Sequence, residues 1–223
     1  INQPAIHILL SRVYLYMENY KECIAEVEKA EKQGIELLNM VNNLAILTDN
    51  GYATISYNNP EIEWIFGPTA VASHWEYLPG TAPAFRVLWD QENDQRFLAY
   101  ALKTADEANT VYLKKPTGSS ELGQSIRSAE AFLNRMEAYA LSGEEGLALA
   151  ELNAFRKTRI IGYTDVTLSG QSLLDEIRLE RRKELCFEGH RWFDLRRQGM
   201  PEIKHAYKAE KGGAVYEYVL QQG

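Results

Sequence analysis

Cysteine is almost absent from this 223-residue chain, which contains only Cys23 and Cys186. The two residues form no CxxC pair and cannot provide a disulfide framework. Because both fall in apolar stretches with helical spacing, we predict two buried thiols that behave as small hydrophobic side chains. A fold stabilised by several disulfides is therefore excluded.

Histidine and the common catalytic motifs are scarce as well. The four histidines lie far apart in the sequence, without HxxxH or HExxH spacing, so we predict no metal site. The sequence also lacks a GxSxG motif, a P-loop, a Rossmann fingerprint and a readable Cys/His nucleophile pair. These absences argue against an enzyme and against a bound cofactor.

Basic residues do not outnumber acidic ones: 24 Lys and Arg face 31 Asp and Glu, for a formal net charge of −7. This charge argues against an extended basic surface for nucleic acid and against a polybasic membrane patch. The net charge is compatible with a neutral ligand such as a sugar. No apolar run approaches the ~20 residues that span a bilayer, and no signal peptide is present. Because Ile1 leads almost directly into a helical pattern, we expect that N-terminal sequence is missing from this chain.

Helical periodicity is what the sequence does contain, and residues 4–34 show it first. Pro4 suits the first turn of a helix, and Gly34 suits the position just after one. A break at residues 18–19 separates two helical patterns, which predicts a helical hairpin. The apolar stripe of the first pattern is Ile6, Leu9, Leu10, Val13 and Met17.

Two later regions, residues 122–158 and 172–199, also predict helices. The first of them repeats the hairpin, with Ile126 as the start of its apolar stripe and a break at residues 142–143. Both hairpins resemble tetratricopeptide repeats, with a tyrosine late in the first helix and a small residue early in the second. The predicted fold class is therefore all-α in the main, a tetratricopeptide-like α–α superhelix of stacked hairpins.

Residues 41–121 lack helical periodicity and are rich in glycine, proline and aromatic residues. We predict an irregular, loop-rich insertion with short strands, and so long an insertion in a compact domain is usually functional. Flat aromatic faces commonly hold sugar rings. The candidate ligand-binding residues are Trp75, Tyr77, Trp89 and Tyr57. The alternative is that these aromatic residues only pack the insertion, and we expect Trp64 and Trp192 to lie in the core.

A second constellation is charged. In residues 174–188 an apolar helical stripe contains Arg181 and Glu188, and buried charges must be paired. We predict a structural ionic network that joins the last two helical units, formed by Glu130, Glu137, Arg156, Arg181, Glu188 and Arg191. The alternative is an acid–base carboxylate pair, as in glycoside hydrolases. Neighbouring arginines favour the network, because they keep a carboxylate ionised whereas a general acid needs a raised pKa.

Residues 177–197 read IRLERRKELCFEGHRWFDLRR. This string resembles the C-terminal signature of the SusD/RagB family of nutrient-binding proteins. Residues 127–156 resemble the family's last tetratricopeptide-like hairpin, residues 93–96 its Asp-x-Arg stretch, and residues 60–66 the strand-like segment ahead of it. With the hairpin at residues 4–34, the resemblance covers nearly the whole chain, so we expect one domain over residues 1–223.

The resemblance implies a cell-surface lipoprotein in the outer membrane of Bacteroidetes-type bacteria. Such a protein caps a TonB-dependent, SusC-like transporter and captures an oligosaccharide or polysaccharide for import, without chemistry on it. Family members are typically longer, and the resemblance implies that their N-terminal lipid anchor is absent from this chain. Some members bind peptides, and stacked tetratricopeptide hairpins bind peptides too, so a peptide-binding or protein-interaction scaffold remains the alternative. A hydrolase is a third, less favoured reading.

Overall fold

The computed structural model falls into two compact units, residues 1–188 and 189–223. It describes residues 1–48, 54–68, 85, 87–103, 111–113, 122–208 and 215–220. The helices described in the first unit are α1 (Gln3–Tyr16), α2 (Tyr20–Glu31), α3 (Met40–Asn43), α4 (Ala45–Thr48), α6 (Gln95–Tyr100), α7 (Ser128–Leu141), α8 (Glu145–Lys157) and α9 (Gly170–Glu184). Its described strands are β1 (Ile62–Pro68), β2 (Ala101–Lys103), β3 (Val111–Leu113) and β4 (Leu122–Arg127). The prediction of a mainly helical fold is confirmed.

The first hairpin consists of α1 and α2, and its helix starts are capped by asparagine. The Asn2 side chain accepts a hydrogen bond from the backbone nitrogen of Ala5 at 2.9 Å, and Pro4 lies in the first turn of α1. The Asn19 side chain caps α2 in the same way. These caps satisfy backbone N–H groups that have no partner within a helix. Beyond α2, Gly34 adopts a φ of +84°, which glycine enters without strain.

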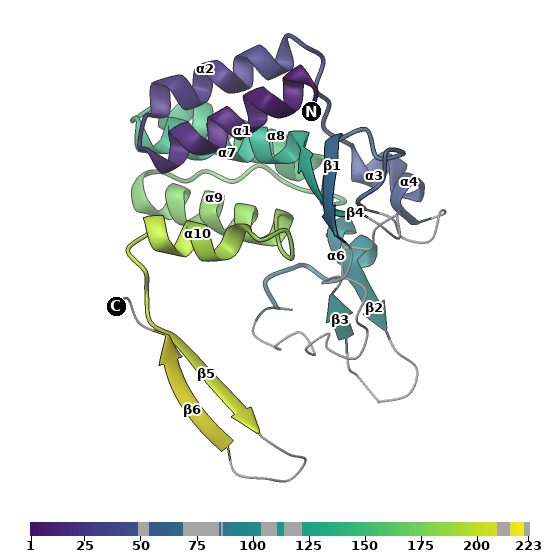
Figure 1. Cartoon of the computed structure of the whole chain (residues 1–223), viewed down its shortest axis with the longest axis vertical. Coiled ribbons are helices and arrows are strands. Elements are labelled where there is room, and N and C mark those ends of the chain that lie inside the picture. Colours follow the sequence, from purple (N-terminus) through teal and green to yellow (C-terminus); the bar gives the residue numbers. More distant parts are fainter. Residues whose placement is uncertain are drawn as a thin grey trace. The chain divides into compact units, whose positions relative to one another are not determined.

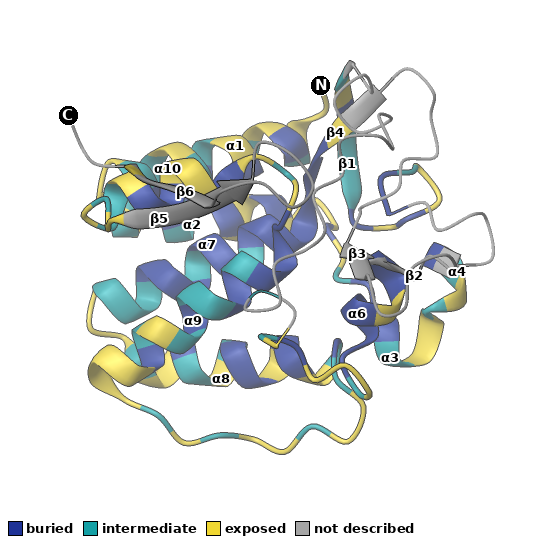
Figure 2. Ribbon diagram, turned by 90° about the horizontal axis from the view of Figure 1, so that it is seen from below, coloured by how far each residue is buried: buried dark blue, intermediate teal, exposed yellow. Residues whose placement is uncertain are grey.

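The central element of the first unit is α7, which packs against α1, α2, α8 and α9 (Figure 1). Most of its residues are buried, whereas the outer helices each expose one face (Figure 2). A core cluster between α7, α8 and α9 is built on Leu133, Leu152, Phe155 and Ile177. The hairpins therefore stack around one helix, as tetratricopeptide-like units do.

Residues 122–127 were expected to begin a helix, and this expectation was wrong. They form strand β4, which pairs antiparallel with β1, for example Trp64 opposite Ile126 (Figure 1). Ile126 is buried, as its place in the predicted apolar stripe implied. It packs, however, in a core with residues of α1 and α2. A single apolar residue fits the period of a helix and that of a strand equally well, so the partner strand decided the structure.

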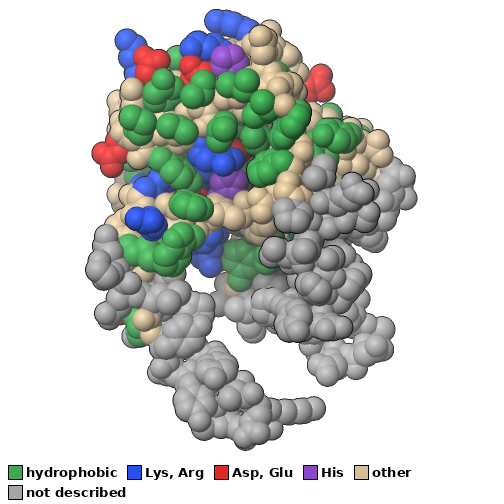
Figure 3. Space-filling model, viewed as in Figure 1, with side chains coloured by type: hydrophobic (Ala, Val, Ile, Leu, Met, Phe, Trp, Pro, Cys, Tyr) green, Lys and Arg blue, Asp and Glu red, His purple; other side chains and the backbone are tan. Residues whose placement is uncertain are grey.

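The apolar stripe of α1 lies on the opposite face from the one that packs. Ala5, Ile8, Ser11 and Leu15 are buried against the rest of the unit. Hydrophobic side chains gather over α1 on the surface (Figure 3), and those of the predicted stripe are 36–67% exposed: Ile6, Leu9, Val13 and Met17. Because α1 is apolar on nearly every side, periodicity predicts the helix but not which face is buried.

The insertion builds a core of its own. In the described part, α3, α4, α6 and the segment around Trp89 contribute to one hydrophobic cluster, and Cys186, just beyond α9, joins it. Strands β2 and β3 pair antiparallel beside it. The short strands were predicted, whereas the short helices were not. Both cysteines are buried, as expected.

The second unit contains α10 (His190–Arg197) and a hairpin of β5 (Ile203–Lys208) and β6 (Val215–Leu220). The strands pair antiparallel, with His205 opposite Tyr218. Trp192 was expected in the core, but its side chain is 45% exposed. At 100° per residue it lies on the side of α10 opposite His190 and Asp194, which are buried. Among the described residues, no helix is long and apolar enough to cross a membrane.

Candidate functional site

Of the four aromatic residues predicted to bind a ligand, the structure describes two, Tyr57 and Trp89. Trp75 and Tyr77 lie outside the described residues. Tyr57 is 68% exposed, in a turn held by buried Asn59, whose side chain donates to the backbone oxygen of Thr54 at 2.9 Å. Its ring is available to a ligand.

Trp89 is only 4% exposed and belongs to the core of the insertion. Its ring packs with Phe97, and Phe85 stands edge-on to it at 4.7 Å between ring centroids. Trp89 therefore cannot offer a flat face to a sugar, and its role as a stacking platform is corrected. The sequence could not distinguish the two roles, because both place a large aromatic residue in a loop-rich segment.

Phe85 is the centre of a small aromatic group, which we name the Phe85 cluster: Phe85, Trp89, Arg182 and Phe187. The Phe187 ring meets the Phe85 ring edge-on at 6.3 Å. The guanidinium carbon of Arg182 lies 5.1 Å from the centroid of the Phe85 ring. The cluster therefore joins the insertion to the C-terminal end of α9, and Phe187 is its most exposed ring.

Charged side chains fill the space between the insertion and α9. Arg127 donates to Glu184 at 2.7 Å and to Glu61 at 2.8 Å. Arg159 donates to Glu61 at 2.6 Å, and the Arg96 guanidinium lies 2.6 Å from the nearest carboxylate of α9. We name this group the buried ionic cluster: Glu61, Asp94, Arg96, Arg127, Arg156, Arg159, Glu180, Lys183, Glu184 and Glu188. These described residues comprise five carboxylates and five cations, so their charges cancel.

Two carboxylates of this cluster, Glu180 and Glu184, have lowered pKa values. Burial alone would raise the pKa of Glu180, but Arg96, Lys183 and Arg156 outweigh it and hold that pKa well below its usual range. The pKa of Glu184 is likewise lowered, because its arginine neighbours outweigh its burial. A general acid needs the opposite shift. The arrangement suits a scaffold and not an acid catalyst.

Two of the six residues predicted to form a network, Arg156 and Glu188, belong to the buried ionic cluster. Arg156 donates to Glu180 at 2.7 Å, and Glu188 accepts from Arg127 at 2.9 Å. Neither partner was in the predicted network: Arg127 ends β4, and Glu180 lies on α9.

Three further members of that prediction lie around α7 and α9. Glu130 accepts from Arg12 of α1 at 2.6 Å, Glu137 accepts from Arg178 at 3.0 Å, and Arg181 donates to a side-chain amide oxygen of α7 at 2.6 Å. Arg191 is exposed in the second unit. The single six-residue network stays a prediction.

Glu61, Asp94, Arg96, Arg127, Arg159, Glu180 and Glu184 were not placed in the predicted network. One signal was available for the pair on α9, because Glu180 and Glu184 are one turn apart and adjoin the apolar stripe. No comparable signal marks Glu61, whose partners lie 66 and 98 residues away.

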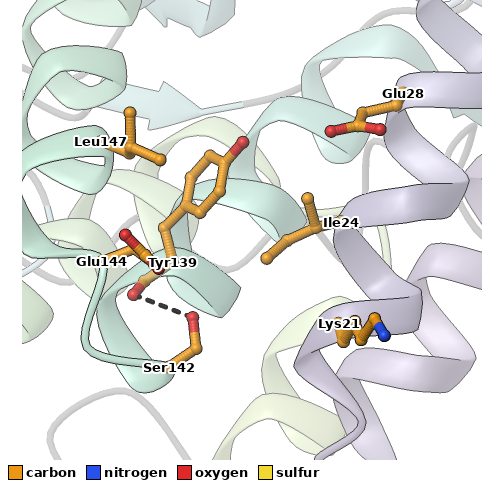
Figure 4. Close-up of a pocket in the computed structure, with 7 residues that line it drawn as sticks. All are labelled: Lys21, Ile24, Glu28, Tyr139, Ser142, Glu144 and Leu147. Carbon is orange, nitrogen blue, oxygen red and sulfur yellow. Dashed lines mark hydrogen bonds between the residues drawn. The ribbon is translucent and has the colours of Figure 1, made fainter.

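An open pocket of about 410 Å³ lies between α2 and the turn that joins α7 to α8. The Tyr139 ring stands between Leu147 and Ile24, and the Glu28 carboxylate points toward the Tyr139 hydroxyl (Figure 4). Burial raises the pKa of Tyr139. The lining residues are Lys21, Ile24, Glu28, Tyr139, Ser142, Glu144 and Leu147. This mixed lining suits an apolar group that carries hydrogen-bonding atoms.

The sequence profile of the SusD family matches residues 87–221, which include the later part of the insertion, the α7–α8 hairpin and the signature on α9 and α10. This chain belongs to the SusD family. No curated protein matches the chain.

Solved SusD-like structures share the fold. A SusD-like carbohydrate-binding protein of Bacteroides vulgatus ATCC 8482 has 22% identity and a TM-score of 0.69, over 100% of this chain and 51% of its own. A SusD superfamily protein of Bacteroides thetaiotaomicron VPI-5482 has 23% identity and a TM-score of 0.68, over 92% and 51%. A laminarin-binding SusD-like protein has 22% identity and a TM-score of 0.62, over 90% and 55%. The chain thus spans about half the length of these structures.

Proposed function

We propose that this SusD-family chain captures a glycan for import through a TonB-dependent, SusC-like transporter in the outer membrane. The observation that carries the proposal is the family match over residues 87–221. Solved relatives that bind carbohydrate, one of them laminarin, support it. The protein would work at the cell surface, attached by an N-terminal lipid outside this chain.

Binding without chemistry is part of this proposal. The buried carboxylates among the described residues have cationic partners, as Glu61 and Glu184 do with Arg159. The lowered pKa values of Glu180 and Glu184 do not suit a general acid. Affinity would come instead from stacking of sugar rings on aromatic faces and from hydrogen bonds to hydroxyl groups. Exposed Tyr57 is one candidate face, and Trp75 and Tyr77 are the others.

Affinity electrophoresis tests the proposal. The chain is run through native gels that contain laminarin or another polysaccharide, beside its Trp75→Ala and Tyr57→Ala variants. We expect at least one polymer to retard the chain and one or both variants to migrate faster in that gel. Tyr139→Ala, which alters the pocket at the helical hairpins, is the control and should migrate as the parent chain does. Retardation by no polymer, or release of reducing ends from a polymer, would contradict glycan capture.

Peptide capture is the second candidate, and the pocket between α2 and the α7–α8 turn favours it. Its apolar residues Ile24 and Leu147 and its charged residues Lys21, Glu28 and Glu144 suit a side chain and backbone of an extended peptide. Pull-down of a random peptide library by the chain and by Tyr139→Ala would separate the candidates. Enrichment that depends on Tyr139, without retardation by any polysaccharide, would favour the peptide.

A further inference from the structure

Arg182 is a half-buried cation for which the described residues provide no carboxylate partner. It stands between Arg181 and Lys183 on α9, and both neighbours are engaged. Arg181 donates to a side-chain amide oxygen of α7 at 2.6 Å, and the Lys183 ammonium lies 3.3 Å from the Glu180 carboxylate. Arg182 instead lies over the Phe85 ring at 5.1 Å. Burial lowers the pKa of its guanidinium.

A second unmatched donor lies in the same cluster. The indole N–H of Trp89 is buried and has no hydrogen-bond acceptor in the part of the chain that is described. Buried donors are nearly always paired. Phe85 lies against both Trp89 and Arg182 but offers only its ring. The Phe85 cluster therefore has donors in excess, and the group that would complete it is an acceptor.

Phe187 is held in an unusual backbone conformation beside these donors. Its φ is +63°, a region that residues other than glycine rarely occupy. The reason is local: Cys186 before it is buried in the core, and Glu188 after it binds Arg127. The turn leaves the Phe187 ring 54% exposed and in edge contact with Phe85. An apolar ring is thus fixed at the surface next to a cation, although the backbone is strained.

We propose that the Phe85 cluster recognises the carboxylate of an acidic sugar, such as a uronate unit of a glycan. This inference rests on the proposed function and narrows its ligand class. The carboxylate would accept two parallel N–H bonds from the Arg182 guanidinium, and the C–H face of the sugar would pack on Phe187. A neutral hydroxyl would leave the charge of Arg182 uncompensated, and a cation would be repelled by it.

The first test compares polygalacturonate with laminarin, a neutral polymer, in native gels. We expect polygalacturonate to retard the chain, and Arg182→Gln to reduce the affinity read from retardation at least tenfold. Lys32→Gln is the matched control, because Lys32 is exposed at the end of α2 and the variant loses the same charge away from both the cluster and the pocket. We expect it to change the affinity less than twofold.

The second test uses Phe187→Gly and separates a binding role from a structural one. Glycine occupies positive φ without strain, so the melting temperature should stay equal or rise. The affinity for polygalacturonate should nevertheless fall at least tenfold, because the packing face is lost. A lower melting temperature with unchanged affinity would assign Phe187 to structure alone and overturn its part in the site.

Other outcomes distinguish the proposal of glycan capture from the proposal of an acidic ligand. Retardation by laminarin alone would leave glycan capture standing and overturn the acidic ligand. Equal losses in Arg182→Gln and Lys32→Gln would show that the polymer responds to net charge and not to a specific site, which also overturns it. Retardation by κ-carrageenan, a sulfated polymer, without retardation by polygalacturonate would overturn the carboxylate assignment. Retardation by no polymer would overturn both proposals.

Discussion

Three arginines converge on Glu184. Its carboxylate accepts hydrogen bonds from Arg127 at 2.7 Å, from Arg159 at 3.1 Å and from Arg96 at 3.1 Å. The side chain is fully buried. A buried ion pair adds little net stability, but removing one partner strands the other charge in a medium of low polarity. Glu184 is therefore a position where a change of one atom has a large effect.

Glu184→Gln keeps the size of the side chain and removes its charge. We expect the free energy of unfolding to fall by about 3–5 kcal/mol, because three buried guanidinium groups lose their shared counter-charge. Urea denaturation followed by circular dichroism measures the change. Glu28→Gln, at an exposed position of α2, is the control and should stay within about 0.5 kcal/mol of the parent. A loss under about 1 kcal/mol for Glu184→Gln would contradict the structural role of the cluster.

Glu188→Gln tests the edge of the same cluster. Glu188 accepts from Arg127, which keeps its contacts with Glu61 and Glu184 when Glu188 is changed. We expect a smaller loss of about 1–3 kcal/mol, because the charged hydrogen bonds from Arg127 to Glu188 are weakened, and a lower melting temperature in calorimetry. An unchanged melting temperature would mean that Glu188 contributes nothing to the cluster.

Among the helices, α1 offers the clearest contrast between two faces. Ile8 is completely buried and Leu9, its neighbour, is 36% exposed. Ile8→Ala should lower the free energy of unfolding by about 2–5 kcal/mol, because it opens a cavity between α1 and its neighbours. Leu9→Ala removes the same number of atoms from the surface and should cost less than about 1 kcal/mol. Chemical denaturation of both variants measures the difference. Equal losses in the free energy of unfolding would show that the apolar face of α1 that contains Leu9 is buried in solution.

The sequence allowed the helices to be predicted better than their packing. Asn2 and Pro4 mark the start of α1, and Gly34 marks the exit from its hairpin, because caps and breaks are local signals. The buried face of α1 and the strand at β4 depend on partners far along the chain, and no local pattern contains that information. Ile126 illustrates this, since its strand partner Trp64 lies within the insertion, far from Ile126 in the sequence.

The candidate site was harder to predict for the same reason. The need to pair the charges on α9 followed from its stripe, but some partners, such as Arg127 and Arg96 for Glu184, are more than fifty residues away. Trp89 was singled out as an exposed aromatic residue, whereas it is buried. Arg182 and Phe187 were visible in the signature string, yet only the backbone geometry and the missing counter-charge distinguish them.

For the molecule as a whole, the ionised cluster determines how stability depends on pH. The folded-state pKa values of Glu180 and Glu184 lie below their unfolded values of about 4.3. The stability that they contribute is therefore fully present above the unfolded pKa and is lost as pH falls below it. We expect the free energy of unfolding, measured with urea, to be similar at pH 7 and pH 6 and to fall steeply between about pH 4.5 and pH 3.

Salt provides the control for that measurement. Because the cluster is buried, 0.5 M NaCl should change the stability at pH 7 only slightly, since salt screens exposed pairs far more than buried ones. A flat pH profile down to pH 3 would contradict the low pKa values. A large loss in salt would indicate that exposed pairs, such as that between Lys157 and Asp165, contribute more than the cluster.

The cancellation of charge in the buried ionic cluster also limits how this sequence can change over generations. If one of four paired residues is replaced by a neutral residue, one charge inside the fold is left uncompensated. These residues are Glu61, Arg127, Arg159 and Glu184. A variant that loses a carboxylate is rescued only if a cation is lost with it, so these positions are free to vary in pairs and not singly. Exposed positions such as Tyr57 carry no such coupling. The proposed binding surface can thus acquire a new specificity while the charged interior stays the same.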